Sequence, residues 1–101
     1  MVLSVLTLQP ADGRIEDLIT FYREGGVLEA SGALSTQVMV AEDNPTTLVV
    51  TALWPDDEAY TVWQNSPVRL EFGRSMASFF DSGDSARSHR FHVVHHTDRE
   101  S

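Results

Sequence analysis

The 101-residue chain contains no cysteine. Disulfides, thiolate metal sites, iron–sulfur clusters and a cysteine nucleophile are therefore excluded. Lysine is absent too, so the seven basic residues are all arginines, and they stand against 15 acidic residues. The formal net charge of −8 gives a surface that repels phosphate backbones, and we do not expect nucleic acid as a partner.

The sequence also lacks a long hydrophobic run: none approaches the ~20 residues that cross a bilayer. The first nine residues have neither the basic segment nor the small-residue cleavage site of a signal peptide. We therefore expect a cytoplasmic protein without a membrane partner. The length predicts a single domain over residues 1–101, which buries a modest share of its surface and would gain stability from a partner subunit.

Apolar, β-prone stretches separated by turn residues predict four strands, at residues 2–8, 33–41, 46–54 and 88–96. The turn signal from Asp43 to Pro45 joins the second and third strands in a hairpin. A polar loop over residues 81–85 precedes the last strand, and a polar tail begins at Thr97.

The spacing of apolar residues predicts three helical segments. The first has Asp12 as its N-cap and an apolar stripe from Ile15 to Tyr22. Each of the following two glycines, Gly25 and Gly26, costs about 1 kcal/mol in a helix, so the helix either kinks there or resumes through residues 27–30.

A second, short helix begins at Pro55, and a third begins with Ser66 as N-cap and Pro67 at the first position. The third helix places on one side Val68, Phe72, Met76, Phe79 and Phe80. The resulting β-α-β-β-α-β order is the ferredoxin-like α+β arrangement, with an antiparallel sheet.

The strand at 46–54 is apolar on both of its faces, as expected for a strand buried on both sides. The helices can cover only one face of a four-stranded sheet. A second copy of the same sheet is the simplest cover for the other face, so the pattern predicts a homodimer. The alternative is a monomer with an unusually apolar sheet.

The segment from Trp54 to Tyr60 (WPDDEAY), followed by Trp63, resembles the antibiotic biosynthesis monooxygenase (ABM) family. The Ser31-Gly32 start of the second strand, the turn at Asp43 and the Ser66-Pro67 helix start are similar to that family as well. The resemblance covers residues 2–97. It implies a dimeric α+β barrel whose subunits each hold a pocket between sheet and helices, with a small-molecule substrate and O₂ as partners.

Within this family, Trp54, Tyr60 and Arg74 resemble the residues around substrate in the branch that oxidises anthrones without a cofactor. The resemblance implies that these three are catalytic: Arg74 would stabilise an oxyanion, and the other two would donate hydrogen bonds. The implied function is a cofactor-independent monooxygenase that oxidises a small aromatic, polyketide or quinol-type substrate. The expected substrate-binding residues are Ser4, Val50, Trp63, Phe72, Met76 and His92.

Histidine side chains commonly serve as general bases, and His92 is the candidate for that role here. Val50 stands where the anthrone-oxidising branch has an asparagine, so one polar contact of that branch is missing here. A non-catalytic dimer that binds a small molecule is therefore the alternative from a different class.

A heme-degrading branch of the family is a further alternative. Trp63 matches its tryptophan, but Ser4 stands where it has an asparagine and Gly73 where it has the histidine that ligates iron. No metal site is expected from the four histidines either. In one strand over residues 88–96, His92 and His96 would share a face but stand about 13 Å apart.

The candidate site residues also have purely structural interpretations. Trp54, Tyr60 and Trp63 could be packing residues of the helix–sheet core. Arg74 could be solvated, or could pair with a carboxylate such as Glu71 or Asp81.

Overall fold

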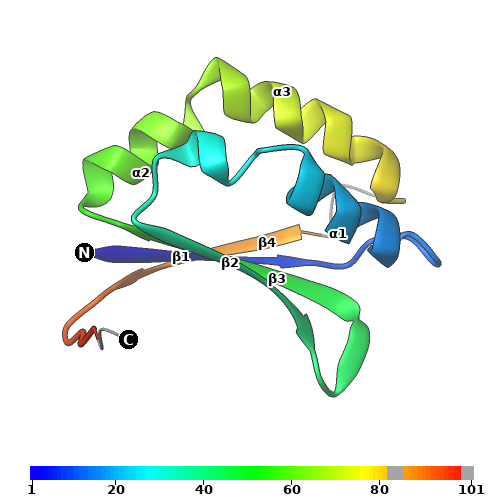
Figure 1. The fold of residues 1–101 in the computed structure, drawn as a ribbon, viewed down its shortest axis with the longest axis horizontal. Helices are drawn as coiled ribbons and strands as arrows, with labels where there is room; N and C mark the ends of the chain where they lie inside the picture. The colour runs from blue at the N-terminus through cyan, green and yellow to red at the C-terminus, as the bar shows by residue number, and fades with distance from the viewer. Residues whose placement is uncertain (82–85, 99–101) are drawn as a thin grey trace.

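The computed structural model describes residues 1–81 and 86–98, and Figure 1 shows a single sheet with all of its helices on one face. The strands are β1 (Val2–Leu8), β2 (Ser35–Ala41), β3 (Asn44–Trp54) and β4 (Ala86–His92). The helices are α1 (Ile15–Glu24), α2 (Asp57–Gln64) and α3 (Pro67–Met76), with 3-10 turns η1 (Glu29–Ser31) and η2 (Ala77–Phe79). The predicted ferredoxin-like α+β fold is confirmed.

The four strands are antiparallel and lie in the order β2-β3-β1-β4. β2 and β3 form the predicted hairpin. The central strand β1 pairs with β3 so that Val2 lies opposite Trp54 and Leu8 lies opposite Leu48. On its other side, β1 pairs with β4, where Ser4 lies opposite Arg90. No helix within the described ranges is both long and apolar enough to cross a membrane.

The core lies between the sheet and the helices and has two parts. The Leu48 cluster comprises Leu8, Leu18, Tyr22, Val27, Leu48 and Val50. The Trp54 cluster comprises Val2, Ala52, Trp54 and Tyr60. Leu48 lies opposite Leu8 at the end of β1, and Trp54 lies opposite Val2 at its start, so the two clusters lie towards opposite ends of β1. Trp63 packs against both clusters.

The helix α2 begins at Asp57, two residues after the predicted start at Pro55, and the α3 start follows the prediction. The Asp56 carboxylate caps α2 by accepting a hydrogen bond from the Ala59 backbone N–H at 2.8 Å, which sets the later start. The Ser66 hydroxyl caps α3 by accepting one from the Val68 N–H at 3.2 Å, with Pro67 at the first helical position. These caps fix where the two helices begin: α2 shortly after the end of β3, and α3 shortly after the end of α2.

The prediction for α1 was wrong at its start. Asp12 is not the N-cap, because Gly13 turns the chain in the left-handed region at φ 76°, and the helix begins only after Arg14. At the other end, α1 stops before Gly25. Gly26 is left-handed at φ 74°, so the helix does not resume, and only the turn η1 follows.

The last strand is shorter and begins earlier than predicted, at Ala86, and ends at His92 instead of His96. β4 pairs only with β1, and His92 already lies opposite Val2, the first residue of β1. The Val93 N–H still donates a hydrogen bond to the Met1 carbonyl, but β1 offers no further residue with which β4 could pair. β2 likewise begins at Ser35, two residues after its predicted start.

The predicted stripe on α3 was wrong at Val68, whose side chain is 48% exposed. Its other members, Phe72, Met76, Phe79 and Phe80, pack against the Leu48 cluster as expected. Residues 82–85 of the predicted polar loop and 99–101 of the predicted tail lie outside the described residues.

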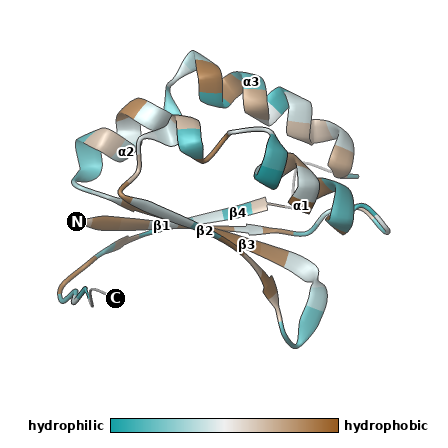
Figure 2. Ribbon diagram, viewed as in Figure 1, coloured by the Kyte–Doolittle hydropathy of each residue, from teal (hydrophilic) through white to brown (hydrophobic). Residues whose placement is uncertain are grey.

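We call the face of the sheet that points away from the helices the outer face. Figure 2 shows apolar segments in the strands and shows that no helix covers this face. Strand alternation and register place on the outer face Leu3, Met39, Val49, Leu53 and Phe91. Met39 is 42% exposed and Phe91 is 51% exposed, so this face carries accessible apolar side chains in a single subunit.

Candidate functional site

A cavity of about 290 Å³ lies between the inner face of the sheet and the helices, at the lower end of the size range for small-molecule pockets. The strands contribute Ser4, Val5, Leu6, Leu8, Val50, Ala52, Trp54, Ala86 and Ser88. The helices and their connections contribute Tyr22, Val27, Leu28, Ser31, Tyr60, Trp63, Arg69, Phe72, Gly73, Met76, Ala77 and Phe80. The cavity is therefore mostly apolar, with a few polar groups at defined positions.

Trp54 closes β3 at one end of the cavity and is only 2% exposed. Its indole Nε1 donates a hydrogen bond to the Ser4 hydroxyl oxygen at 3.0 Å, and that hydroxyl donates to the Ala52 carbonyl at 3.4 Å. Trp54 and Ser4 come from neighbouring strands and share the inner face. The bond holds the indole in one orientation and satisfies its N–H within the protein.

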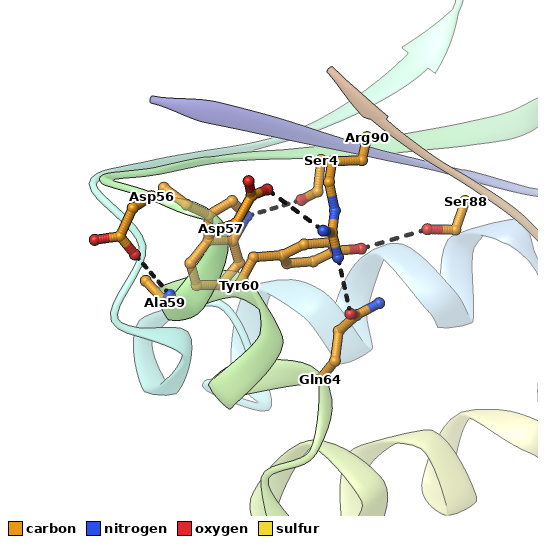
Figure 3. Close-up of polar contacts among 9 residues, drawn as sticks. Ser4, Asp56, Asp57, Ala59, Tyr60, Gln64, Ser88 and Arg90 are labelled. Atoms are coloured by element: carbon orange, nitrogen blue, oxygen red, sulfur yellow. Dashed lines mark hydrogen bonds and ion pairs between the residues drawn. The ribbon is translucent and has the colours of Figure 1, made fainter. Parts of the chain in front are cut away.

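Tyr60 comes from α2 and packs its ring on Trp54, with the ring centroids 5.4 Å apart. Its hydroxyl lies 3.4 Å from the Ser88 hydroxyl on β4, as Figure 3 shows. The Arg90 guanidinium, also from β4, lies 4.6 Å from the centroid of the Tyr60 ring. Tyr60 is thus held from β3 on one side and from β4 on the other.

The Arg90 guanidinium makes two further contacts with α2: an ion pair with the Asp57 carboxylate at 3.4 Å and a hydrogen bond to the Gln64 side-chain oxygen at 3.3 Å (Figure 3). We call these three contacts, to Asp57, Tyr60 and Gln64, the Arg90 clamp. They tie the helix beside the cavity to the edge strand β4. Sequence reasoning missed Arg90 and Ser88, although both lie on the face of β4 that strand alternation assigns to the interior.

Most of the predicted site residues line this one cavity. They are Ser4, Val50, Trp54, Tyr60, Trp63, Phe72 and Met76. Val50 and Ala52 share the inner face with Trp54, as the resemblance implied. The catalytic and binding roles of these residues stay predictions.

Arg74 and His92 do not line the cavity. The Arg74 side chain is 75% exposed and pairs with the Glu71 carboxylate at 3.1 Å, one of the pairings left open by the sequence. Successive helix residues are rotated by about 100°, so the residue after Gly73 points away from the cavity. His92 is exposed at the end of β4. The oxyanion role of Arg74 and the base role of His92 remain predictions, and neither side chain lies at the cavity.

The arginine that does line the cavity is Arg69, which sequence reasoning missed. It lies three residues before Phe72 and seven before Met76, so the spacing that selected those two residues also selects Arg69. Tyr22, from α1, faces the same space and is 5% exposed. Burial raises the pKa of Tyr22 to about 12, and the charge of Arg69 acts in the opposite direction.

The described lining residues include no histidine and no carboxylate. Gly73, at the place where the heme-degrading branch has its iron ligand, lines the cavity without a side chain, and a Cβ built there would meet nothing within 4 Å. These residues do not fit an axially ligated heme. Over residues 1–81 and 86–98, no three histidine, aspartate or glutamate side chains gather as a metal site. The argument that His92 and His96 share one strand, about 13 Å apart, was wrong, because β4 ends at His92. His96 lies beyond the strand, beside the Asp98 carboxylate at 3.1 Å.

Comparison with known proteins agrees with this architecture. The model of the family described as antibiotic biosynthesis monooxygenase (ABM) matches residues 1–75. The match covers all three helices of the cavity wall except the last residue of α3, and three of the four strands. The chain belongs to the ABM family.

Solved structures with the same fold are many, at low sequence identity. SnoaB from Streptomyces nogalater, a cofactor-independent oxygenase solved in a mutant form, superposes with a TM-score of 0.75 at 15% identity over 97% of each chain. Rv0793 from Mycobacterium tuberculosis gives a TM-score of 0.78 at 12% identity over 96% of this chain and 98% of its own. PA3566 from Pseudomonas aeruginosa gives 0.73 at 18% identity, over 93% and 94%. No curated protein sequence matches the chain.

Proposed function

We propose that the protein is a cofactor-independent monooxygenase that oxidises a small, electron-rich aromatic substrate with O₂ inside the cavity. One observation carries the proposal: Trp54, Tyr60 and an arginine meet an apolar cavity in a chain that belongs to the ABM family. The cofactor-independent oxygenase SnoaB, which has the same fold, supports the reaction class. Anthrones and hydroquinones, the compounds of polyketide and quinol type, are the substrates to test.

The reaction balances without an external reductant when the substrate supplies the electrons. An anthrone loses a proton to give an electron-rich anion, which transfers an electron to O₂ and recombines with it as a peroxide at the ring carbon. The O–O bond then breaks: one oxygen atom stays as the new carbonyl, and the other leaves as water with the two hydrogens of the former CH₂ group. The protein supplies a fixed, dry environment for these steps.

The residues of the cavity have distinct parts in this proposal. The cavity offers apolar contacts to the faces of an aromatic ring, from Val50, Phe72 and Met76. Tyr60, held by Trp54 and the Arg90 clamp, presents a hydroxyl beside Ser88. This pair of hydroxyl groups can donate a hydrogen bond to a substrate oxygen and orient the ring.

The proposal includes a homodimer formed through the outer face. Leu3, Leu53 and Phe91 are neighbours there across three strands, because Leu3 pairs with both of the others. Apolar side chains on a small sheet with helices on its opposite face favour a second copy as cover. Each subunit would keep its own cavity, because the cavity lies on the helix side of the sheet, away from the outer face.

Dissolved-oxygen consumption with a panel of anthrones and hydroquinones, with no cofactor added, tests the function. The matched variants are Gly73→Phe, which places a ring at the cavity wall, and Gly73→Ala, which leaves the space open. We expect uptake with the wild type and Gly73→Ala, and at least about 10-fold less with Gly73→Phe. No uptake with any compound, together with a tightly bound ligand recovered unchanged after aerobic incubation, would instead support the non-catalytic binding dimer.

A further inference from the structure

The cavity carries one ionic group among its described lining residues, the guanidinium of Arg69. This is unexpected in a chain with 15 acidic residues and a net charge of −8. Every other polar group on the lining is a hydroxyl, an indole N–H or a backbone group. A ligand in the cavity therefore meets one fixed positive charge and no fixed negative charge.

Arg69 is not engaged by the protein in the way that neighbouring arginines are. Arg14, Arg74 and Arg90 each pair with a carboxylate, at 2.8, 3.1 and 3.4 Å. In the described part of the chain, no carboxylate lies within 4.0 Å of the Arg69 guanidinium. Among the described residues, no carboxylate occupies this guanidinium at the cavity. Its paired N–H donors match the two oxygens of a carboxylate, and its charge also attracts the single oxygen of a phenolate.

Tyr22 completes this end of the cavity. It belongs to the Leu48 cluster and comes from α1, whereas Arg69 comes from α3. Both residues line the cavity, and the charge of Arg69 acts on the Tyr22 hydroxyl. Burial raises the pKa of the Tyr22 hydroxyl to about 12. A tyrosine hydroxyl already keeps its proton at neutral pH, and the raised pKa extends this into alkali, so the Tyr22 hydroxyl can donate to an anion that Arg69 attracts.

The opposite end of the cavity has little capacity for an anion. The Trp54 N–H is already donated to Ser4, and the Ser4 hydroxyl is directed to the Ala52 carbonyl. The Tyr60 and Ser88 hydroxyls lie within hydrogen-bonding distance of one another. These groups are neutral and are partly engaged with one another, whereas Arg69 is charged and pairs with none of the carboxylates that the structure describes.

We infer that Arg69 and Tyr22 form an anion subsite, and that the cavity selects small planar aromatic anions over their neutral isosteres. The anionic oxygen of the ligand lies at Arg69 and Tyr22, and its ring lies against Val50 and Phe72 towards Trp54. The inference rests on the proposed function in placing the substrate in this cavity. It adds that the ligand is recognised as an anion, which agrees with the absence of a carboxylate or imidazole base from the described lining.

Isothermal titration calorimetry with 2-naphthoate and with 2-naphthamide, which is of the same shape but uncharged, tests the inference. We expect the wild type to bind the naphthoate about 10-fold more tightly, the value of one charge-assisted hydrogen-bonding contact. Arg69→Gln should remove this preference while still binding the amide. Tyr22→Phe should reduce the preference by several-fold.

A second arginine variant separates a local contact from general electrostatics. Arg23→Gln removes an exposed charge next to Tyr22 in sequence and should keep the preference. An equal preference for acid and amide in the wild type, a loss of preference in Arg23→Gln as large as in Arg69→Gln, or no naphthoate binding up to ~1 mM would overturn the inference.

4-Nitrophenol extends the test from carboxylates to phenolates, because its anion has its own absorption band. At a fixed pH near its titration midpoint, the wild type should increase the phenolate absorbance and Arg69→Gln should not. An increase of equal size in both proteins would contradict phenolate recognition by Arg69. All of these measurements are made at equilibrium, so their results are independent of oxygen uptake. Anion selectivity without oxygen uptake would contradict only the proposed oxygenase activity. Uptake with neutral substrates and no anion selectivity would contradict only the anion subsite.

Discussion

The guanidinium carbon of Arg90 lies 4.6 Å from the centroid of the Tyr60 ring, which joins the edge strand β4 to the helix beside the cavity. The same guanidinium contacts Asp57 and Gln64 on that helix. One long side chain therefore holds α2 in place at three points. Since Tyr60 lines the cavity, the contact links the packing of the sheet edge to the shape of the site.

Arg90→Met tests the Arg90 clamp, because methionine keeps much of the apolar stem but loses the charge. The side chain is 39% exposed, so we expect a loss of unfolding free energy below about 1 kcal/mol, measured by urea denaturation. The rate of oxygen uptake should fall by a larger factor than this small loss of unfolding free energy would explain, because Tyr60 loses the contact that holds its ring. Arg23→Met, an exposed change on α1, serves as the control and should alter neither quantity.

Trp54 and Ser4 form a pair whose energetic coupling can be measured. Trp54→Phe removes the indole donor, and Ser4→Ala leaves the buried indole N–H without its acceptor at 3.0 Å. Each single change should cost about 1–3 kcal/mol of unfolding free energy. The double variant should cost about 1 kcal/mol less than the sum, as expected for groups that share a bond. Fully additive costs would mean that the bond does not contribute to stability.

Gly73 allows the size of the cavity to be changed with little damage to the fold. Gly73→Ala should raise the unfolding free energy by up to about 1 kcal/mol, because alanine favours a helix and its Cβ meets nothing within 4 Å. Gly73→Phe should stay folded by circular dichroism but bind 2-naphthoate at least several-fold more weakly. Equal affinity in the two variants would show that position 73 does not face the bound ligand.

The burial of Tyr22 predicts a specific loss of stability in alkali. The folded-state pKa of about 12 lies above the ordinary value of 10.0, so the unfolded chain releases the tyrosine proton first as the pH rises. Stability is therefore full below pH 10 and is lost as the pH rises towards 12. Between about pH 9 and 11 the wild type should lose on the order of 1 kcal/mol more than Tyr22→Phe, as measured by denaturant titration. Parallel pH profiles for the two proteins would argue against this burial.

The outer face gives the test of assembly. Phe91→Glu places a charge on a side chain that is 51% exposed in one subunit, so the subunit should still fold. Light scattering coupled to size exclusion should give the mass of two chains for the wild type and of one chain for the variant. Val62→Glu changes a more exposed apolar residue on α2, 65% accessible, and should remain a dimer. A wild type with the mass of one chain at micromolar concentration would contradict the proposed homodimer.

The sequence predicted the elements well where short-range signals dominate. The Ser66-Pro67 start of α3 and the apolar pattern of β3 each encode local structure directly. The Asp43 turn signal located the hairpin, although β3 begins at Asn44, two residues before its predicted start. The end of β4 could not be predicted in this way, because it depends on where its partner β1 begins. The start of α1 likewise depends on the backbone angle that Gly13 adopts, for which Asp12 gave a misleading signal.

For the site, periodicity identified Phe72 and Met76 as residues of the cavity wall. The same spacing selects Arg69 and not Arg74. Arg74 was predicted from the family resemblance, which takes no account of the rotation of each residue around the α3 axis. The Arg90 clamp was not predictable either, since its partners lie 26 to 33 residues away in sequence. The cytoplasmic location stays a prediction.

The most direct test of the proposed chemistry uses the panel compound with the fastest oxygen uptake and follows isotope incorporation by mass spectrometry. With ¹⁸O₂ and the wild-type protein in ordinary water, we expect one labelled oxygen in the product and the second in water, and a much slower reaction with Gly73→Phe. An unlabelled product, whose new oxygen comes from water, would contradict a monooxygenase acting in this cavity. Product formation at the same rate without protein would contradict it as well.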